Sequence, residues 1–291
     1  MKIVQGDEIE WKRGLEYRGG TFHYRNLLEG DPGTIGNFQL SMGRNDKDFV
    51  SPRHRHNFEQ FRFQLEGDLE FGRDGTMKPG MVGYFPEGAH YGPQTSQMDA
   101  LTIVLQFGGA SGSGYLSRAE VTRGMQELSK FGTFEGGVYR RNEGVPGKKN
   151  MDGYQAIWEH VNGRPMEYPK PRYPMPLMMD ESHFSWVPVP DEPGVEEKQL
   201  GQFTERRTDA AILRVAAGAT HALRARSIYF CKSGIGSIGN APVRGYTTIH
   251  VASGDAACVS ATEELIFLRM GLPDLSNMVM QGSASASLAA E

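Results

Sequence analysis

Residues 60–65 alternate between polar and apolar side chains, which is the period of a β-strand with two unlike faces. Phe61, Phe63 and Leu65 share the apolar face. The opposite face is polar, and two histidines a few residues earlier keep its parity. This polar face therefore carries side chains that bind metals or donate hydrogen bonds: His54, His56, Gln60 and Arg62.

Short runs of this kind recur in both halves of the chain, separated by turns that are rich in glycine and proline. Strands this short and this regularly spaced are typical of β-sandwiches and β-barrels, so the predicted fold class is all-β. The predicted strands are 21–28, 35–42 and 101–107 in the first half, and 184–188, 198–203, 211–215, 217–223 and 228–234 in the second.

The middle of the chain differs from both halves. Residues 117–120 read Ser-Arg-Ala-Glu, a capping box that predicts a helix from Ser117 to about Phe131, ended by Gly132. The segment 132–150 is predicted as an exposed loop, and 151–162 as a strand or a short helix.

Five prolines between residues 164 and 176 exclude regular structure there. This proline-rich segment is expected to be either a stiff arm that packs on a barrel or on a second subunit, or a linker.

Turn residues after the polar strand bring a third histidine back towards the first two. Gly67-Asp68, Lys78-Pro79-Gly80 and Pro86-Glu87-Gly88 each predict a turn, and His90 follows the last one. Imidazoles of His54, His56 and His90 on one side of an ion would leave other positions open to a substrate. The sequence thus predicts a divalent transition-metal site.

The spacing of these residues resembles the two motifs of the cupin superfamily, G-x5-H-x-H-x3–4-E-x6-G and G-x5-P-x-G-x2-H-x3-N. The chain departs from them in having Gln60 at the glutamate position, Gln94 near the asparagine position, and one residue rather than two between Gly88 and His90. The resemblance implies a jelly-roll barrel with the metal inside. It depends on His54, His56, Gly67, Gly80, Pro86, Gly88 and His90.

The second half repeats the frame without its histidine set. Aligning Gly234 with Gly67 puts His221 opposite His54 but replaces the other motif positions by Leu223, Ser227 and Ala256. The predicted architecture is a bicupin with one metal barrel and one degenerate barrel. The predicted boundaries are 1–112 and 183–275 for the barrels, 113–182 for the helical and proline-rich segment between them, and 276–291 for a flexible tail.

Charge and composition restrict the partners. The net charge of −4 and the pI of about 6.1 provide no basic field for nucleic acid or an anionic membrane. The two cysteines and the lack of a secretory leader or a long apolar run predict a cytoplasmic protein. The chain has a long N-terminal segment and an arm between its barrels. Both features resemble those of dimeric cupins, so a homodimer is expected.

The expected cofactor is a divalent transition metal held by His54, His56 and His90, with neutral Gln60 as a weak fourth ligand or as a catalytic group. Fe(II) is favoured, with zinc, nickel, manganese and copper as alternatives, because imidazole suits several of these metals. Arg62 is expected to bind a carboxylate or enolate of the substrate. Phe58, Tyr91 and Gln94 are expected as further substrate contacts.

These residues predict a mononuclear non-haem enzyme. The leading hypothesis is an Fe(II) dioxygenase that acts on a small anionic aromatic or enolisable carbonyl compound, as three-histidine cupin dioxygenases do. One alternative is a metal-dependent isomerase, cyclase or lyase that uses no oxygen. Another is a barrel that binds a small ligand without turning it over.

Overall fold

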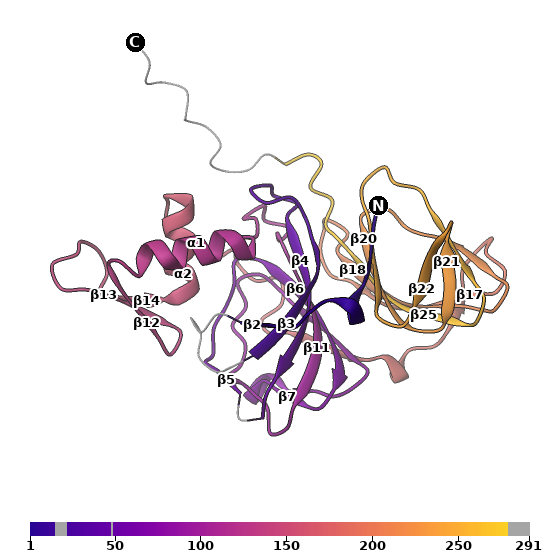
Figure 1. The fold of residues 1–291 in the computed structure, drawn as a ribbon, viewed down its shortest axis with the longest axis horizontal. Helices are drawn as coiled ribbons and strands as arrows, with labels where there is room; N and C mark the ends of the chain where they lie inside the picture. The colour runs from indigo at the N-terminus through magenta and orange to yellow at the C-terminus, as the bar shows by residue number, and fades with distance from the viewer. Residues whose placement is uncertain (15–21, 48, 279–291) are drawn as a thin grey trace, which may run out of the picture.

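The computed structural model describes residues 1–14, 22–47 and 49–278, and it is an all-β molecule with two short α-helices among these residues. Two β-barrels lie side by side, one from each half of the chain, and the helices flank the first barrel (Figure 1). The all-β class predicted from the sequence is confirmed.

Two antiparallel sheets form the N-terminal barrel. The larger has the order β15-β9-β6-β11-β4-β3-β2 and the smaller β5-β10-β7-β8. Their bounds are β2 (Lys12–Arg13), β3 (Phe22–Glu29), β4 (Phe38–Asn45), β5 (Val50–Ser51), β6 (Glu59–Glu66), β7 (Leu69–Glu70), β8 (Thr76–Met77), β9 (Met81–Phe85), β10 (Gln94–Thr95), β11 (Ala100–Phe107) and β15 (Leu177–Asp180).

The C-terminal barrel repeats this arrangement with sheets of order β1-β23-β20-β25-β18-β17-β16 and β19-β24-β21-β22. Their bounds are β1 (Lys2–Gln5), β16 (Val187–Pro188), β17 (Val195–Gln202), β18 (Asp209–Val215), β19 (Thr220–Ala222), β20 (Ser227–Ser233), β21 (Ile235–Ile238), β22 (Ala241–Arg244), β23 (Thr247–Val251), β24 (Cys258–Ala261) and β25 (Leu265–Gly271).

The two barrels share one apolar core. The outer faces of both large sheets contribute to it, and Phe203 of the second half stacks on Tyr84 of the first with ring centroids 4.5 Å apart. Phe61 and Phe63, on the predicted apolar face of β6, lie in this core. The polar face of the same strand therefore turns into the first barrel.

The interiors of the two barrels differ. The second is filled by a separate apolar cluster that includes Leu213, Tyr229, Ile249 and Phe267. In the first, β6 and β11 turn polar side chains inward, among them Gln60, Arg62, Gln64, Thr102 and Gln106. Polar side chains pack less tightly into a core than apolar ones do, and a cavity remains inside this barrel.

Strands cross the predicted domain boundaries. β1, from the N-terminus, pairs with β23 of the second barrel, with Ile3 opposite Ile249. β15, from the segment between the barrels, pairs with β9 of the first barrel, with Met178 opposite Gly83. The sheets therefore do not end at residues 112 and 182.

The segment between the barrels contains α1 (Arg118–Leu128), α2 (Gly153–Asn162) and a small sheet of β12 (Gly132–Glu135), β13 (Val138–Arg141) and β14 (Asn150–Asp152). The capping box is confirmed: Ser117 Oγ accepts from Glu120 N at 3.2 Å, and Ser117 N donates to Glu120 Oε2 at 2.8 Å.

The prediction of a plain loop over 132–150 is wrong. Gly136 and Gly137 both have positive φ, 56° and 81°, which is the backbone of a tight hairpin turn between β12 and β13. The proline-rich segment has neither helix nor strand until β15 begins, as expected.

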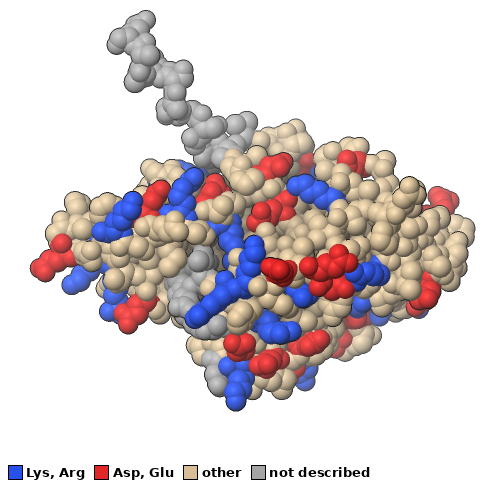
Figure 2. Space-filling model, viewed as in Figure 1, with Lys and Arg blue, Asp and Glu red and all other residues tan. Residues whose placement is uncertain are grey.

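No helix in the described ranges is long and apolar enough to cross a membrane. Acidic and basic side chains are interspersed over the face that Figure 2 shows, in keeping with the small net charge. Most of the predicted tail, from residue 279 onward, lies outside the described residues.

Candidate functional site

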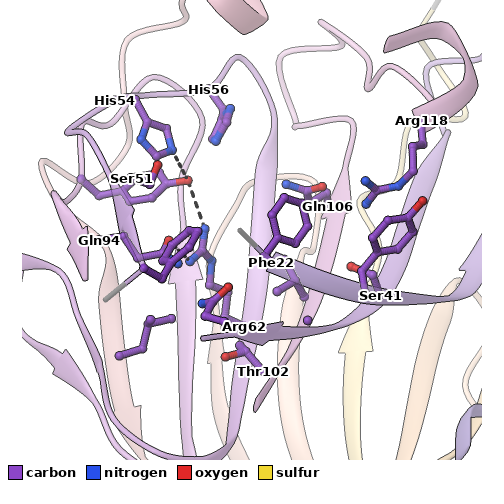
Figure 3. A pocket seen from close by; sticks show the side chains of 17 residues that line it. Phe22, Ser41, Ser51, His54, His56, Arg62, Gln94, Thr102, Gln106 and Arg118 are labelled. Carbon is purple, nitrogen blue, oxygen red and sulfur yellow. Dashed lines mark hydrogen bonds between the residues drawn. The ribbon is translucent and has the colours of Figure 1, made fainter. Parts of the chain in front are cut away.

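A cavity of about 170 Å³ opens inside the N-terminal barrel, and its lining residues come from strands of both sheets and from α1 (Figure 3). It is smaller than the pockets of about 300–1,000 Å³ that hold drug-sized ligands, so it suits a small metabolite. The lining consists of Phe22, Tyr24, Ser41, Gly43, Asn45, Phe49, Ser51, His54, His56, Arg62, Leu69, Tyr91, Gln94, Thr102, Val104, Gln106 and Arg118.

Strand register explains why these residues meet. Val104 on β11 pairs with Ser41 of β4 on one side and with Arg62 of β6 on the other. Residues directly opposite each other in an antiparallel pair point to the same face of the sheet. The three side chains therefore form one inward row across the floor of the barrel.

Arg62 is a buried cation at one end of the cavity, with 7% of its surface exposed. Its Nε and Nη2 donate to Gln60 Oε1 at 3.0 and 2.9 Å, and its Nη1 donates to Gln94 Oε1 at 2.7 Å. Its guanidinium carbon lies 4.5 Å from the ring centroid of Phe85. The inward direction predicted for Gln60 and Arg62 is confirmed, and Gln94 lines the cavity.

Tyr91 connects the guanidinium to a histidine. Its hydroxyl oxygen accepts from Gln60 Nε2 at 3.1 Å and from Arg62 Nη2 at 3.2 Å, and it lies 3.0 Å from His54 Nε2. His54 Nδ1 lies 2.6 Å from the carbonyl oxygen of Pro52, which can only accept, so Nδ1 carries the proton. In the neutral imidazole Nε2 is then the acceptor, and the Tyr91 hydroxyl donates to it.

His56 stands beside this pair, with its ring centroid 4.9 Å from that of His54. The ring of Phe58 stacks on His56 at 4.2 Å and contacts Tyr115 and Tyr154 under the helices. Phe58 thus supports His56 from behind and does not line the cavity, which differs from its predicted role as a substrate contact.

His90 does not join the cluster. Tyr91 forms an isolated antiparallel bridge with His54, with backbone hydrogen bonds of 2.9 and 3.1 Å in the two directions. Tyr91 therefore shares the face of His54, and His90, one residue earlier, faces away and is exposed. Partial desolvation, and then the positive charges of Arg55 and Arg53, lower the pKa of His90.

The three-histidine metal set therefore does not form. Among the described residues no group of three or more His, Cys, Asp or Glu side chains lies close enough to hold an ion. The predicted fourth ligand is also turned elsewhere, because Gln60 Oε1 accepts from Arg62 and its amide nitrogen faces Tyr91. The donors at the expected metal position are His54, His56 and the phenol oxygen of Tyr91, and they do not match the predicted ligand set.

One departure in the sequence pointed to this outcome. The cupin motif places two residues between its glycine and its histidine. With Ala89 and His90 as those two residues after Gly88, the motif position falls on Tyr91 rather than His90. Gly88 itself has a φ of 77°, and a Cβ there would lie 2.0 Å from the carbonyl oxygen of Pro169. The proline-rich segment thus packs directly on the turn that comes before His90 and Tyr91 and so helps to decide which of the two faces the cavity.

Glu59 points to the opposite face of β6, away from the cavity. Its carboxyl is fully buried near Glu87, and Arg172 of the proline-rich segment approaches Glu59 Oε1 at 3.6 Å and Glu87 Oε1 at 2.7 Å. Burial and the neighbouring Glu87 raise the pKa of Glu59 to about 8. Thr208 Oγ1, from the second half of the chain, lies 3.5 Å from Glu59 Oε2.

His221, which stands opposite His54 in the aligned frame of the second barrel, is a structural residue. His221 Nδ1 lies 2.6 Å from Glu192 Oε2, and Leu223, opposite His56 in the aligned frame, lies in the apolar cluster.

Sequence reasoning missed Arg118 and the inward residues of β4 and β11. The register of these strands was not known from the sequence, and a capping box predicts where a helix begins but not what its first side chain reaches.

No family model and no curated protein sequence matches the chain. Solved structures do match its fold. A proposed dioxygenase from Nostoc punctiforme superposes with a TM-score of 0.63 at 12% identity, over 98% of this chain and 87% of that one. A glyoxylate-induced protein from Pseudomonas aeruginosa gives 0.56 at 13%, over 94% and 87%.

Oxalate decarboxylase from Bacillus subtilis gives a TM-score of 0.54 at 14% identity, over 94% of this chain and 78% of that one. These likenesses, together with the two barrels, show that the chain has a bicupin fold, the architecture that the motif resemblance predicted. At such low identity they establish the fold and not the reaction.

Proposed function

We propose that the cavity of the N-terminal barrel is an active site that moves a proton on a small anionic carbonyl compound. The observation that carries this proposal is the chain of hydrogen bonds from Pro52 O through His54 and Tyr91 to Arg62. A hydroxyl donor, a neutral imidazole acceptor and a guanidinium within one small cavity are the groups that acid–base catalysis at an enolisable carbon needs.

Each residue has a definite part in this scheme. Arg62, with Gln94, would hold the carboxylate of the substrate or the enolate oxygen. His54 Nε2, left basic by the tautomer that the carbonyl oxygen of Pro52 fixes, would take the proton from the substrate carbon while Tyr91 gives its own proton to the carbonyl oxygen. The imidazolium would then return a proton to the Tyr91 oxygen and leave the enol. Isomerisation, cyclisation and lyase reactions all use a proton transfer of this kind.

The second candidate is the metal-dependent enzyme predicted from the sequence, with Fe(II) as the leading metal and dioxygen as co-substrate. Two observations favour it: the bicupin fold is shared with a proposed dioxygenase and a decarboxylase, and the rings of His54 and His56 lie side by side. In this candidate Tyr91 would stand in place of the third histidine beside His54 and His56.

A proton-exchange experiment tests the proposal. Protein freed of metal by chelation is incubated in D2O with enolisable anions such as pyruvate and acetylacetonate, and deuterium incorporation is followed by NMR. We expect exchange above the buffer rate, lost by 10²-fold or more in Tyr91→Phe and His54→Gln and kept in the exposed control His90→Gln.

Oxygen uptake separates the candidates. Uptake by iron-loaded protein with catechols, gentisate-like acids or β-diketones, and no exchange without metal, would replace the first candidate by the second. Saturable binding without either reaction would show that the barrel is a ligand-binding module.

A further inference from the structure

We infer that the cavity is built for a dianion, a small molecule with two acidic groups joined by a short apolar middle, which Arg62 holds at one end and Arg118 at the other. The inference names the substrate class of the site proposed above and rests on that function only in using the same cavity.

Arg118 is a second cation in the cavity wall. It is the first residue of α1, and the capping box of Ser117 and Glu120 fixes the start of that helix. Its guanidinium carbon lies 3.8 Å from the ring centroid of Tyr24, which also lines the cavity. The stacked ring holds the planar guanidinium in one orientation and leaves its N–H groups in the plane for a ligand.

One donor of Arg118 has no acceptor. Its Nε is buried and makes no hydrogen bond with any residue that the structure describes. A buried donor without an acceptor is costly, so an oxygen of a bound ligand that reached Nε would stabilise this arrangement. A carboxylate is the natural partner, because its two oxygens match the guanidinium fork.

The two arginines lie on opposite sides of the cavity. In Figure 3 Arg62 lies with His54 on one side of Phe22, and Arg118 lies on the other. The apolar ring of Phe22 lies between them in that view, and no Asp or Glu lines the described part of the cavity. Two cations with an apolar middle and no lining carboxylate favour two negative groups over one.

Binding of dicarboxylates and their half-amides tests the inference. Malonate, succinate, glutarate, adipate and phthalate are titrated into the protein by calorimetry at constant ionic strength, each beside the half-amide that keeps its length and loses one charge. We expect the best diacid to bind at least about tenfold more tightly than its half-amide.

Variants assign the second charge. In Arg118→Met the ratio of diacid to half-amide affinity should fall to about one, while half-amide binding stays within about twofold. Arg123→Met, an exposed arginine on the same helix that does not line the cavity, should keep the native ratio. Thermal melts show whether each variant is folded.

The inference is overturned if half-amides bind as well as diacids, if no diacid binds, or if Arg118→Met weakens both ligands equally. These outcomes are distinct from failure of the proposed function. Diacid preference without proton exchange would leave the binding site standing, and exchange on monoanions without diacid preference would leave only the function standing.

Discussion

The hydroxyl of Tyr91 is the point where the side chains of the site meet. It accepts from Gln60 and Arg62, both buried, and contacts His54 Nε2. Removing its oxygen would take the acceptor from Gln60 Nε2 and one of two acceptors from Arg62 Nη2, which keeps Gln60 Oε1. The same oxygen is the proton donor proposed for catalysis. A single residue thus couples the stability of the barrel interior to its chemistry.

Replacing Tyr91 by phenylalanine should lower the free energy of unfolding by about 1–3 kcal/mol, because buried donors lose a hydrogen bond. The neighbouring change His90→Ala should stay within about 0.5 kcal/mol, since that side chain is exposed. Urea unfolding of both variants measures the difference. Equal losses would show that His90, and not only Tyr91, contributes to the buried network.

Glu59 should make the protein less stable as the pH rises. The buried carboxyl keeps its proton up to about pH 8, whereas in the unfolded chain it ionises near 4.5, so the folded state binds more protons between these values. The loss should reach a few kcal/mol, at about 1.4 kcal/mol for each pH unit of that interval.

Glu59→Gln removes this titration. The variant should match the native protein below pH 4.5 and exceed it in stability at pH 9, as measured by thermal or urea unfolding across the pH range. Parallel stability curves for the two proteins would refute a protonated Glu59.

At the scale of elements, the start of α1 determines the position of Arg118, one of the two arginines that line the cavity. Ser117 ends the irregular chain before the helix and fixes its first turn through two hydrogen bonds with Glu120. Arg118 is the next residue, so the cap also fixes the position of its backbone at the start of the helix. The strands of the barrel floor set the other end of the cavity through the pairing of Val104 with Ser41 and Arg62.

Ser117→Ala should lower the free energy of unfolding by about 1 kcal/mol, because the helix loses the acceptor for its third backbone N–H. Ser129→Ala, at the other end of the same helix, is the matched control, and its smaller effect is expected because it removes no N-terminal cap. Guanidinium unfolding of both variants provides the comparison. A native-like Ser117→Ala would mean that tertiary contacts alone hold the start of α1.

At the scale of the whole molecule, the two barrels form one folding unit. They share the core around Tyr84 and Phe203. Each barrel also takes up a strand from another part of the chain: β1, from the N-terminus, pairs in the second barrel, and β15, from the segment between the barrels, pairs in the first. Such coupling predicts a single unfolding transition. The homodimer stays a prediction, which light scattering would check.

Phe203→Ala should lower the free energy of unfolding by about 3–5 kcal/mol by opening a cavity between the barrels. The exposed Val187→Ala should change it by less than about 0.5 kcal/mol. Calorimetry should show one transition that shifts as a whole. Two separate transitions in the Phe203 variant would show that the barrels unfold independently.

The sequence by itself determined the class of fold and the faces of its main strand. Period-two alternation assigned Gln60 and Arg62 to one face and Phe61 and Phe63 to the other, since alternation is a local property of extended backbone. The capping box and the prolines located α1 and the irregular arm for the same reason: each acts through its own backbone.

Only the tertiary structure decided which residues meet. The pairing of Tyr91 with His54 shifted the third position by one residue and turned His90 outward, because register between distant strands depends on turns and packing. The same physics placed Arg118 across from Arg62 and buried Glu59 beside Glu87 and Arg172. Local patterns specify faces and ends, whereas a site is made of contacts between segments that the sequence does not place side by side.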